Sequence, residues 1–206
     1  MDAQCNEVSI DPIVSHYDRN ADRLGQGYES LAFETVHHDL LPYLPELPAR
    51  VLDVGAGSGR DAGALAARGY DVLAVEPSIK LRALGSRFHV FPNLIWRADQ
   101  LPELGSLEQS ERFDLVLCSA VWMHLRRDAQ RSAMRRIADL CRKRARFCIT
   151  FRTGMMGEET LVLGVSNADV IADAELNGFQ LLKKTTSPDW CERTGVDWIS
   201  LIFKKV

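Results

Sequence analysis

The sequence predicts an α/β protein with a mostly parallel seven-stranded sheet, helices on both faces and a C-terminal antiparallel hairpin. Three observations point to this class. Short apolar runs of strand length alternate along the chain with segments of helical periodicity. The links between them are short, as in repeated strand–helix–strand units whose strands are parallel. The last two apolar runs follow each other without a helix between them, which indicates a hairpin.

The segment before the first strand is predicted to be mainly helical. From Glu29 to Leu44, apolar side chains recur at near-helical spacing, which favours one helix. Pro45 and Pro48 follow this stretch, and proline ends a helix because it lacks the N–H that the next turn would use.

Five apolar runs are predicted to be strands of the core, because each is short and apolar, as a buried strand is. These strands are Arg50–Val54, Asp71–Val75, Leu94–Arg97, Phe113–Cys118 and Ala145–Phe151. Helices are expected at Arg60–Arg68, Ser78–Arg87, Arg126–Arg142 and Asn167–Asn177, and further strands at Gln180–Thr186 and Asp197–Phe203. In such a sheet, a ligand binds beyond the carboxyl ends of the strands.

Length and composition set limits on the kind of protein. The 206 residues favour a single domain, and 46% hydrophobic and 26% charged residues exclude a collagen-like or wholly disordered chain. The net charge of −3 argues against binding of nucleic acid or an anionic membrane over the whole surface. No apolar run approaches the roughly 20 residues that span a bilayer, and no secretory signal is visible, so we expect a cytoplasmic protein without membrane contact.

The five cysteines fit neither a zinc site nor a disulfide framework. Their number is odd, and no pair forms a C-x-x-C motif. Cys118, Cys141 and Cys148 lie among apolar residues and are expected to pack as small hydrophobic side chains. We therefore expect no metal site and no disulfides.

The segment Val51–Arg60, which reads VLDVGAGSGR, carries the clearest chemical signal. It combines an expected strand, a glycine-rich turn and the start of a helix, and glycines there let the backbone turn sharply and approach a ligand. Glu76 lies at the end of the next expected strand, about 20 residues after Gly55, where an acid accepts hydrogen bonds from ribose hydroxyls. The site is therefore predicted to bind a cofactor that contains a nucleoside.

Two details indicate which cofactor this loop favours. A dinucleotide-binding loop reads G-x-G-x-x-G, but Arg60 stands at the position of its third glycine, and the third glycine here is Gly59. Asp53 precedes the first glycine, where a carboxylate is unfavourable beside a pyrophosphate and suits a cationic ammonium group. S-adenosylmethionine (SAM) carries such a group and a ribose with both hydroxyls free. The residues thus favour SAM over NAD, and no P-loop pattern occurs.

Several motifs in order resemble those of class I SAM-dependent methyltransferases of the small, single-domain bacterial kind. VLDVGAGSGR resembles the first motif of that family, and VEPS, around Glu76, the acidic second one. RADQLPEL, around Asp99, resembles the loop that receives adenine, and FDLVLCSAVWMHL the motif that lines the methyl-transfer site. The leader HYDRNADRLGQGYES resembles a segment that covers the cofactor. The resemblance spans residues 15–151 and implies a Rossmann-like class I methyltransferase fold, with a looser likeness to tellurite and thiopurine methyltransferases.

The resemblance also divides one domain, 1–206, into three parts. They are a helical lid segment (1–48), a SAM-binding core (49–151) and a C-terminal segment on the substrate side (152–206). Relatives carry a Lys-Pro-Gly-Gly turn before the fifth strand, where this chain reads CRKRAR over residues 141–146. That turn must therefore be built differently here.

The resemblance implies roles for the cofactor-binding residues. Asp53 and the glycine loop are expected at the amino-acid end of SAM, Glu76 at the ribose and Asp99 at the adenine amino group. Arg60 either pairs with the SAM carboxylate, since a guanidinium matches a carboxylate bidentately, or lies exposed in the first helical turn. The implied cofactor-binding residues are Tyr17, Asp53, Gly55, Ala56, Gly57, Gly59, Arg60, Glu76, Pro77, Asp99, Gln100, Leu101, Ser119 and Ala120.

The methyl acceptor is expected beside the loop that follows the fourth strand. His124 in this loop is the candidate catalytic base, because a neutral imidazole can deprotonate an O–H or N–H nucleophile; alternatively, it only hydrogen-bonds within the pocket wall. Tyr17 and Tyr28 lie in the expected lid, and their alternative is packing against the first helix. Arg152 follows the fifth strand and could hold an anionic or carbonyl group. The candidate substrate-binding residues are thus Tyr28, His124 and Arg152.

Other polar and aromatic residues have structural explanations. His37 and His38 are expected at the surface or in packing, Trp122 and Trp198 in the core, and Asp189 paired with Arg193. The stretch Arg126–Arg146 holds nine basic and two acidic residues. It is either a phosphate-binding face or the solvated side of an amphipathic helix.

The sequence therefore predicts a SAM-dependent methyltransferase that acts on O or N of a small-molecule metabolite or natural-product intermediate. A small acceptor is favoured because the chain is short and shows no added recognition domain. The expected assembly is a monomer or homodimer. One alternative is an RNA or protein methyltransferase that uses the arginine-rich stretch. The other is a SAM-binding protein without catalysis, since a fold alone does not fix a function.

Overall fold

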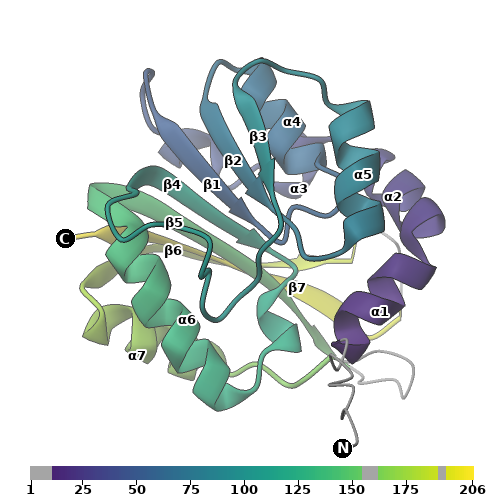
Figure 1. Ribbon diagram of the computed structural model, residues 1–206. Coiled ribbons are helices and arrows are strands. Elements are labelled where there is room, and N and C mark those ends of the chain that lie inside the picture. The colour runs from purple at the N-terminus through teal and green to yellow at the C-terminus, as the bar shows by residue number, and fades with distance from the viewer. Residues whose placement is uncertain (1–10, 155–161, 190–193) are drawn as a thin grey trace, which may run out of the picture.

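The described residues of the computed structural model, 11–154, 162–189 and 194–206, form one seven-stranded sheet with helices around it (Figure 1). The strands are β1 (Arg50–Val54), β2 (Asp71–Val75), β3 (Leu94–Arg97), β4 (Phe113–Ser119), β5 (Cys141–Gly154), β6 (Phe179–Pro188) and β7 (Val196–Lys205). The helices are α1 (Pro12–Arg19), α2 (Ala21–Glu29), α3 (Phe33–Val36), α4 (Arg60–Ala67), α5 (Ile79–Phe88), α6 (Arg127–Leu140) and α7 (Asn167–Leu176). Short 3₁₀ helices lie at η1 (Leu41–Tyr43) and η2 (Trp122–His124).

The strand order is β3-β2-β1-β4-β5-β7-β6. The strands β1 to β5 run parallel, whereas β7 is antiparallel to both β5 and β6. This confirms the predicted mostly parallel sheet with a C-terminal hairpin. Strand β1 pairs with β2 on one side and β4 on the other, so the chain order reverses there. The crevice at such a reversal is where this class of sheet binds ligands.

The sheet separates two apolar layers, because successive side chains of a strand point to opposite faces. Leu52 of β1 belongs to the core cluster that includes α6 and α7, and its neighbour Val51 to the cluster that includes α3 and α4. Figure 1 shows α6 and α7 together on one face of the sheet and α3 and α4 on the other. Coverage of both faces explains why the parallel strands are continuous apolar runs.

A cluster of buried phenylalanines joins the antiparallel hairpin to the parallel part of the sheet. Phe147 of β5 stacks on Phe203 of β7 with ring centroids 5.9 Å apart, and lies 5.6 Å from Phe179 of β6. All three side chains are buried. Each such aromatic pair contributes about 1 kcal/mol beyond the burial of its surface.

The leader differs from the predicted single helix over Glu29–Leu44. Helix α2 ends at Glu29, α3 has only four residues, and η1 follows after a break. Pro42 lies within η1, where its missing N–H prevents a regular α-helix from continuing. The apolar spacing has another cause: Phe33 of α3 and Leu40, in the turn before η1, are both buried in the same core cluster.

The boundary between α6 and β5 also differs from the prediction. Helix α6 ends at Leu140 and β5 begins at Cys141, so the predicted helix end at Arg142 and strand start at Ala145 are wrong. The pairing with β4 shifts register here, and Arg144 adopts a left-handed φ of 68°. An arginine thus adopts the conformation for which glycine is the usual residue.

The remaining predicted strands and helices are confirmed, and β6 and β7 extend beyond their predicted ends. Cys118, Cys141 and Cys148 are buried and free, as predicted, and Trp122 is fully buried. Among the described helices, none combines the length and the apolar character needed to cross a membrane. Cys5, Cys191 and the predicted partner Arg193 lie outside the described residues.

Candidate functional site

The glycine loop connects β1 to α4 and has the geometry that its sequence predicts. Gly55, Gly57 and Gly59 all have left-handed φ angles, of 70°, 59° and 92°. A Cβ atom on Gly55 would lie 2.3 Å from Cγ2 of Val121, and one on Gly59 would lie 2.8 Å from the Trp96 ring. Any residue other than glycine at position 55 or 59 would therefore meet both backbone strain and a clash.

Glu76 directly follows β2 and faces the glycine loop. Its Oε2 accepts a hydrogen bond of 2.8 Å from the Gly57 N–H, and its Oε1 accepts one of 2.8 Å from the Ser78 N–H. Burial raises the pKa of Glu76 to about 7, although both N–H groups act in the opposite direction. The Glu76 carboxylate thus connects the glycine loop with the acidic second motif. Its oxygens can accept further hydrogen bonds from hydroxyl groups.

Asp53 lies beneath the glycine loop and is almost fully buried. Its Oδ2 has no hydrogen-bond partner among the described residues. Burial and the nearby charge of Asp61 raise the pKa of Asp53 well above its ordinary value. A buried acceptor without a partner suits a cationic group and opposes an anion. The site therefore fits the ammonium group of SAM better than a pyrophosphate.

The predicted adenine loop is fixed by its own side chains and by α6. Asp99 accepts from the Gln100 N–H (2.8 Å), the Ser106 N–H (2.7 Å) and the Ser106 hydroxyl (2.6 Å). Arg136 of α6 donates to the carbonyls of Glu103 (3.0 Å), Leu104 (3.1 Å) and Leu107. Sequence analysis missed this role of Arg136, because nothing in its spacing links it to a loop some thirty residues earlier.

His124 lies beyond the end of β4 and contacts helix α1. The Tyr17 hydroxyl is 2.9 Å from Nε2 of His124, and the two rings meet edge-on. Burial raises the pKa of Tyr17 above its ordinary value. The phenol therefore stays protonated at neutral pH and can donate to the lone pair of a neutral imidazole.

Thr150 of β5 holds the loop that precedes His124. The Ala120 N–H donates to the Thr150 carbonyl (3.0 Å) and hydroxyl (3.1 Å), and the Ser119 hydroxyl lies 3.2 Å from the Thr150 hydroxyl. Ala120 has a left-handed φ of 60°. Strained non-glycine residues concentrate at functional sites, where surrounding contacts hold them. Sequence analysis did not identify Thr150.

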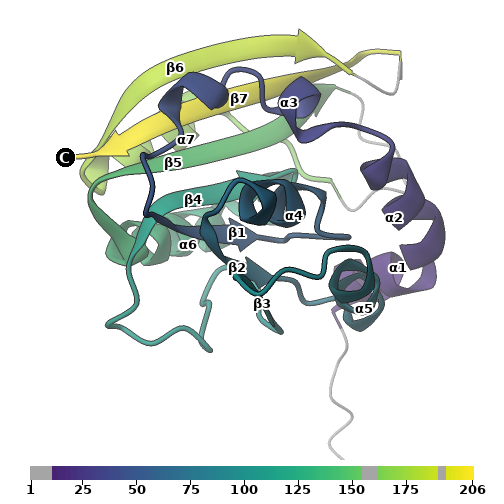
Figure 2. The same ribbon diagram turned by 90° about the horizontal axis from the view of Figure 1, so that it is seen from above.

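The helices α1 and α2 dock on the predicted cofactor motifs, and Figure 2 shows them grouped with α5 at one end of the sheet. Asp18 accepts from the Ser78 hydroxyl (2.6 Å) and the Lys80 N–H (3.1 Å). The Tyr28 ring lies 3.5 Å from the point where a Cβ of Gly57 would stand. Both the ribose motif and the glycine loop are thus covered by the N-terminal segment.

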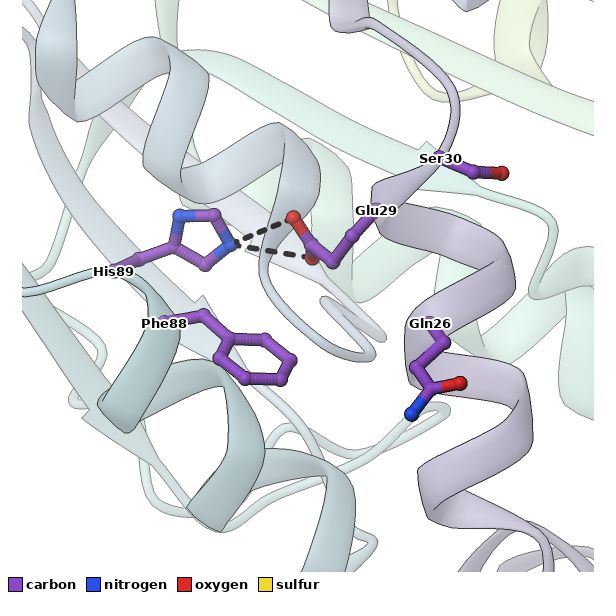
Figure 3. Close-up of a pocket in the computed structure, with 5 residues that line it drawn as sticks. All are labelled: Gln26, Glu29, Ser30, Phe88 and His89. Carbon is purple, nitrogen blue, oxygen red and sulfur yellow. Dashed lines mark hydrogen bonds and ion pairs between the residues drawn. The ribbon is translucent and has the colours of Figure 1, made fainter.

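A cleft of about 490 Å³ lies between α2 and the end of α5 (Figure 3). Glu29 crosses it to His89 at 3.2 Å and also accepts from the Ser58 hydroxyl at 2.6 Å. The His89 ring fills the space left by a missing side chain at Gly63, since a Cβ there would lie 2.2 Å from Nδ1 of His89. Glu29 therefore links α2 to the glycine loop through its hydrogen bond with Ser58. The other lining residues of the cleft are Gln26, Ser30 and Phe88.

A buried group of three side chains, the Arg60 network, consists of Arg60, Asp61 and His37. Arg60 donates to both oxygens of Asp61, from Nε at 2.6 Å and Nη2 at 2.9 Å, and Nε2 of His37 lies 2.8 Å from Oδ2 of Asp61. Burial would raise the pKa of Asp61, but His37 and Arg60 lower it below its ordinary value. The alternative of an exposed Arg60 is therefore wrong. His37 is buried and packs against Phe33, which agrees with the prediction of packing, and it also contacts Asp61.

The chain matches the methyltransferase domain family over residues 26–183. It belongs to this family. The match covers most of the chain and both the glycine loop and the loop after β4. No curated protein matches the chain.

Solved structures agree with the family. A TehB-like SAM-dependent methyltransferase from Corynebacterium glutamicum is 25% identical, with a TM-score of 0.66, and the match covers 93% of this chain and 99% of that one. The 1,6-didemethyltoxoflavin-N1-methyltransferase of Burkholderia thailandensis, solved with S-adenosylhomocysteine (SAH), is 20% identical, with a TM-score of 0.67 and coverage of 94% and 85%. The magnesium protoporphyrin IX methyltransferase of Synechocystis PCC 6803, solved with SAM, is 17% identical, with a TM-score of 0.62 and coverage of 100% and 87%.

This protein is therefore a SAM-dependent methyltransferase with a Rossmann-like class I fold. SAM is its methyl donor. Three features of the site fit SAM: the Asp53 oxygen that has no partner among the described residues, the left-handed glycines and the buried Glu76. Among the residues that the structure describes, no group of three or more His, Cys, Asp or Glu side chains is arranged to hold a metal ion.

The arginine-rich stretch of this methyltransferase is not one helix. Arg142, Lys143, Arg144 and Arg146 lie on β5. Arg127 forms a bidentate pair with Asp173, with Nη2 3.0 Å from Oδ1, and Arg142 pairs with Asp114 at 2.7 Å. Together with Arg136, these arginines bind within the chain.

Arg152 lies on β5, close enough to Tyr17 for its charge to act on that phenol. It pairs in register with Trp198 of β7, and its charge acts on Tyr17 by lowering the pKa of that phenol against the larger effect of burial. Trp198 is only partly buried, which corrects its predicted place in the core, and its Nε1 donates to Asp189 at 2.7 Å. The predicted pairing of Asp189 involves Arg193, which lies outside the described residues.

Proposed function

We propose that this methyltransferase transfers the methyl group to an oxygen or nitrogen atom of a small-molecule acceptor, with His124 as the general base. The observation that carries this proposal is the 2.9 Å contact between the Tyr17 hydroxyl and Nε2 of His124 beyond the end of β4. The hydroxyl marks a position from which a donor group reaches the imidazole lone pair. An acceptor hydroxyl or amine that replaces the Tyr17 hydroxyl there can give its proton to Nε2.

Each cofactor-binding residue has a proposed role in this reaction. When bound, SAM supplies a methyl group already activated on a sulfonium sulfur. Asp53, Arg60 and the backbone of the glycine loop, including Ala56, hold the amino-acid end. Glu76, beside Pro77, accepts from the ribose hydroxyls, and Asp99, Gln100 and Leu101 contact the adenine. Ser119 and Ala120 line the position of the methyl group.

The chain contributes mainly alignment and proton removal. Holding an acceptor in line with an activated methyl group lowers the barrier by about 7–11 kcal/mol. A base adds a further factor of roughly 10²–10⁴ when the acceptor carries a proton of high pKa. The lid segment, 1–48, excludes water and includes Tyr17 and Tyr28, of which Tyr28 also faces the acceptor.

Two further observations support a small acceptor. Arg152 lies close enough to Tyr17 for its charge to lower the pKa of that phenol, so an anionic or carbonyl group of the acceptor would be held there. The enzyme of similar fold from Burkholderia thailandensis binds 1,6-didemethyltoxoflavin, a small molecule. We propose that residues 152–206 form the acceptor side of a single domain, in a monomer or homodimer in the cytoplasm.

A screen with methyl-labelled SAM tests the acceptor class. The purified enzyme is incubated with phenols, catechols, aromatic nitrogen heterocycles and amines, with and without a carboxylate, and with total RNA and protein as counter-substrates. We expect label in a small phenol or nitrogen heterocycle, with a preference for acceptors that carry an anion. Label in RNA or protein alone would overturn the proposal.

The role of His124 is tested on the acceptor found in that screen. We expect His124→Ala to lower kcat by roughly 10²–10⁴ while the affinity for SAH stays unchanged, because the base acts on the acceptor and not on the cofactor. Tyr17→Phe retains the ring contact and removes only the hydroxyl. An unchanged kcat in His124→Ala would refute the assignment of the base.

A further inference from the structure

The Arg60 network has no task in the fold that would require ionised groups. Burying an ion pair costs desolvation energy that its own attraction barely recovers, so such a pair is weak evidence for stability. Here Asp61 and His37 are almost fully buried, and the Arg60 side chain is largely so. A well-packed apolar set would join α3 to α4 equally well. The charges therefore point to a purpose in the site.

The position of Arg60 suggests that purpose. It is the first residue of α4 and directly follows Gly59, so its backbone belongs to the cofactor loop. The charge of Arg60 acts on two carboxyl groups near that loop, those of Asp53 in β1 and Glu29 in α2. Two of its three nitrogens, Nε and Nη2, are engaged by Asp61, and Nη1 has no partner among the described residues.

We propose that Asp61 and His37 are positioning residues that hold the Arg60 guanidinium so that Nη1 meets the carboxylate of the cofactor's methionine part. Asp61 fixes two corners of the planar guanidinium, which leaves the third in one orientation. His37 in turn fixes Asp61 from the opposite side, by the 2.8 Å contact. A residue of the lid segment thus sets the geometry of cofactor recognition without touching the cofactor.

The same network also gives Arg60 a preorganised charge. A long arginine side chain loses rotamer entropy when it orders on a ligand, and this loss is smaller if the side chain is already held in place. We therefore expect the network to affect only ligands that carry the carboxylate. The inference rests on the proposed role of Arg60, and it is independent of the methyl acceptor.

The test compares two ligands by calorimetric titration of the purified enzyme. SAH has the carboxylate, and decarboxylated SAH lacks it but retains the amine, ribose and adenine. We expect Asp61→Asn and His37→Phe to weaken SAH about tenfold, which is about 1.4 kcal/mol, and to leave decarboxylated SAH unchanged. Arg60→Ala should give at least the same loss of selectivity, and His37→Gln, which keeps a donor, should restore most of it.

A matched control is Asp173→Asn, which breaks another arginine–aspartate pair at α7. It should leave the ratio of the two affinities at the wild-type value. If Asp61→Asn is unfolded at the assay temperature, Asp61→Glu keeps the charge but displaces the carboxylate, and the same loss of selectivity is expected.

The possible outcomes separate the two levels of the proposal. Equal weakening of both ligands in Asp61→Asn and His37→Phe would show a structural role only and overturn the inference. A ratio that falls in Arg60→Ala but not in the other variants would do the same while leaving the role of Arg60 intact. A ratio unchanged in Arg60→Ala would overturn the proposed role of Arg60 as well.

Discussion

Glu76 shows, at the scale of a single residue, how a binding site can weaken the protein that carries it. Its carboxyl group is buried, and burial raises its pKa from about 4.5 to about 7. The N–H groups of Gly57 and Ser78 and the charge of Arg82 compensate only part of this effect. Ribose hydroxyls would add donors to the ionised form, so the cofactor relieves a cost that the protein alone bears.

This cost predicts a pH dependence of stability in the absence of cofactor. The folded protein holds the Glu76 proton up to about pH 7, whereas the unfolded chain releases it near pH 4.5. The contribution to stability is therefore fully present below pH 4.5 and is lost as the pH rises through 7, by about 3 kcal/mol. Glu76→Gln stays neutral and escapes this loss. We expect the melting temperature of wild type minus that of Glu76→Gln to fall by several degrees between pH 5 and pH 8, and a constant difference would contradict the shift.

Single residues were predictable where a local pattern defines them. Asp53 lies near the end of one expected strand, the glycines follow that strand and Glu76 follows the next one, so the sequence indicates their place at the crevice. His37, Thr150 and Arg136 were not predictable as parts of the site, because each acts across segments that are far apart in sequence.

The loop that begins at Asp99 is held partly by its own hydrogen bonds and partly by helix α6. Its internal bonds run from Asp99 to Gln100 and Ser106, while Arg136 holds the carbonyls of its second half. A hydrogen bond with a charged donor contributes about 1.5–3 kcal/mol, so one guanidinium on several carbonyls strongly restricts the loop.

This arrangement predicts an effect of α6 on cofactor affinity. Arg136→Ala should weaken SAH about tenfold, or about 1.4 kcal/mol, because binding must then order the loop. The control is Arg135→Ala on the same helix, whose exposed side chain contacts only Ser132 among the described residues. Titration with SAH and with adenosine checks this. If Arg135→Ala weakens SAH as much as Arg136→Ala, the effect is one of surface charge and not of loop order.

The leader shows the limit of periodicity at the scale of elements. Its apolar spacing correctly marks Phe33 and Leu40 as buried residues, but Phe33 lies in α3 and Leu40 in the turn before η1, and not in one helix. Periodicity records which positions face the core and not where the chain bends between them. The boundary of α6 fails for a related reason, since Arg144 forms the left-handed turn without a glycine to announce it.

The whole molecule was predictable in its class, because alternating strands and helices allow few sheet topologies. The order of the strands at the C-terminal edge was not predictable, because apolar runs do not indicate which of the two hairpin strands pairs with β5. The structure has the order β5-β7-β6, in which the phenylalanines of the three strands pack together.

These rings predict the largest stability effect that we expect from the hairpin. Phe203→Ala should lower the free energy of unfolding by about 3–5 kcal/mol, because it leaves a cavity between Phe147 and Phe179. Phe88→Ala removes a half-exposed ring and should change it by less than about 0.5 kcal/mol. Urea unfolding of both variants checks the difference. Equal values would mean that the hairpin is not part of the cooperative core.

The position of β7 has a consequence for the order in which the protein can be built. A ribosome releases β6 before β7, yet β7 is the strand that lies between β6 and β5. Until β7 emerges, β6 has no strand to pair with, and one edge of β5 is unpaired and open to other nascent chains. Thr185 of β6 also waits to bind Asp39, made 146 residues earlier. The leader that covers the glycine loop is thus translated before the strands of the sheet, and its anchor on β6 is completed only after β7 has been synthesised.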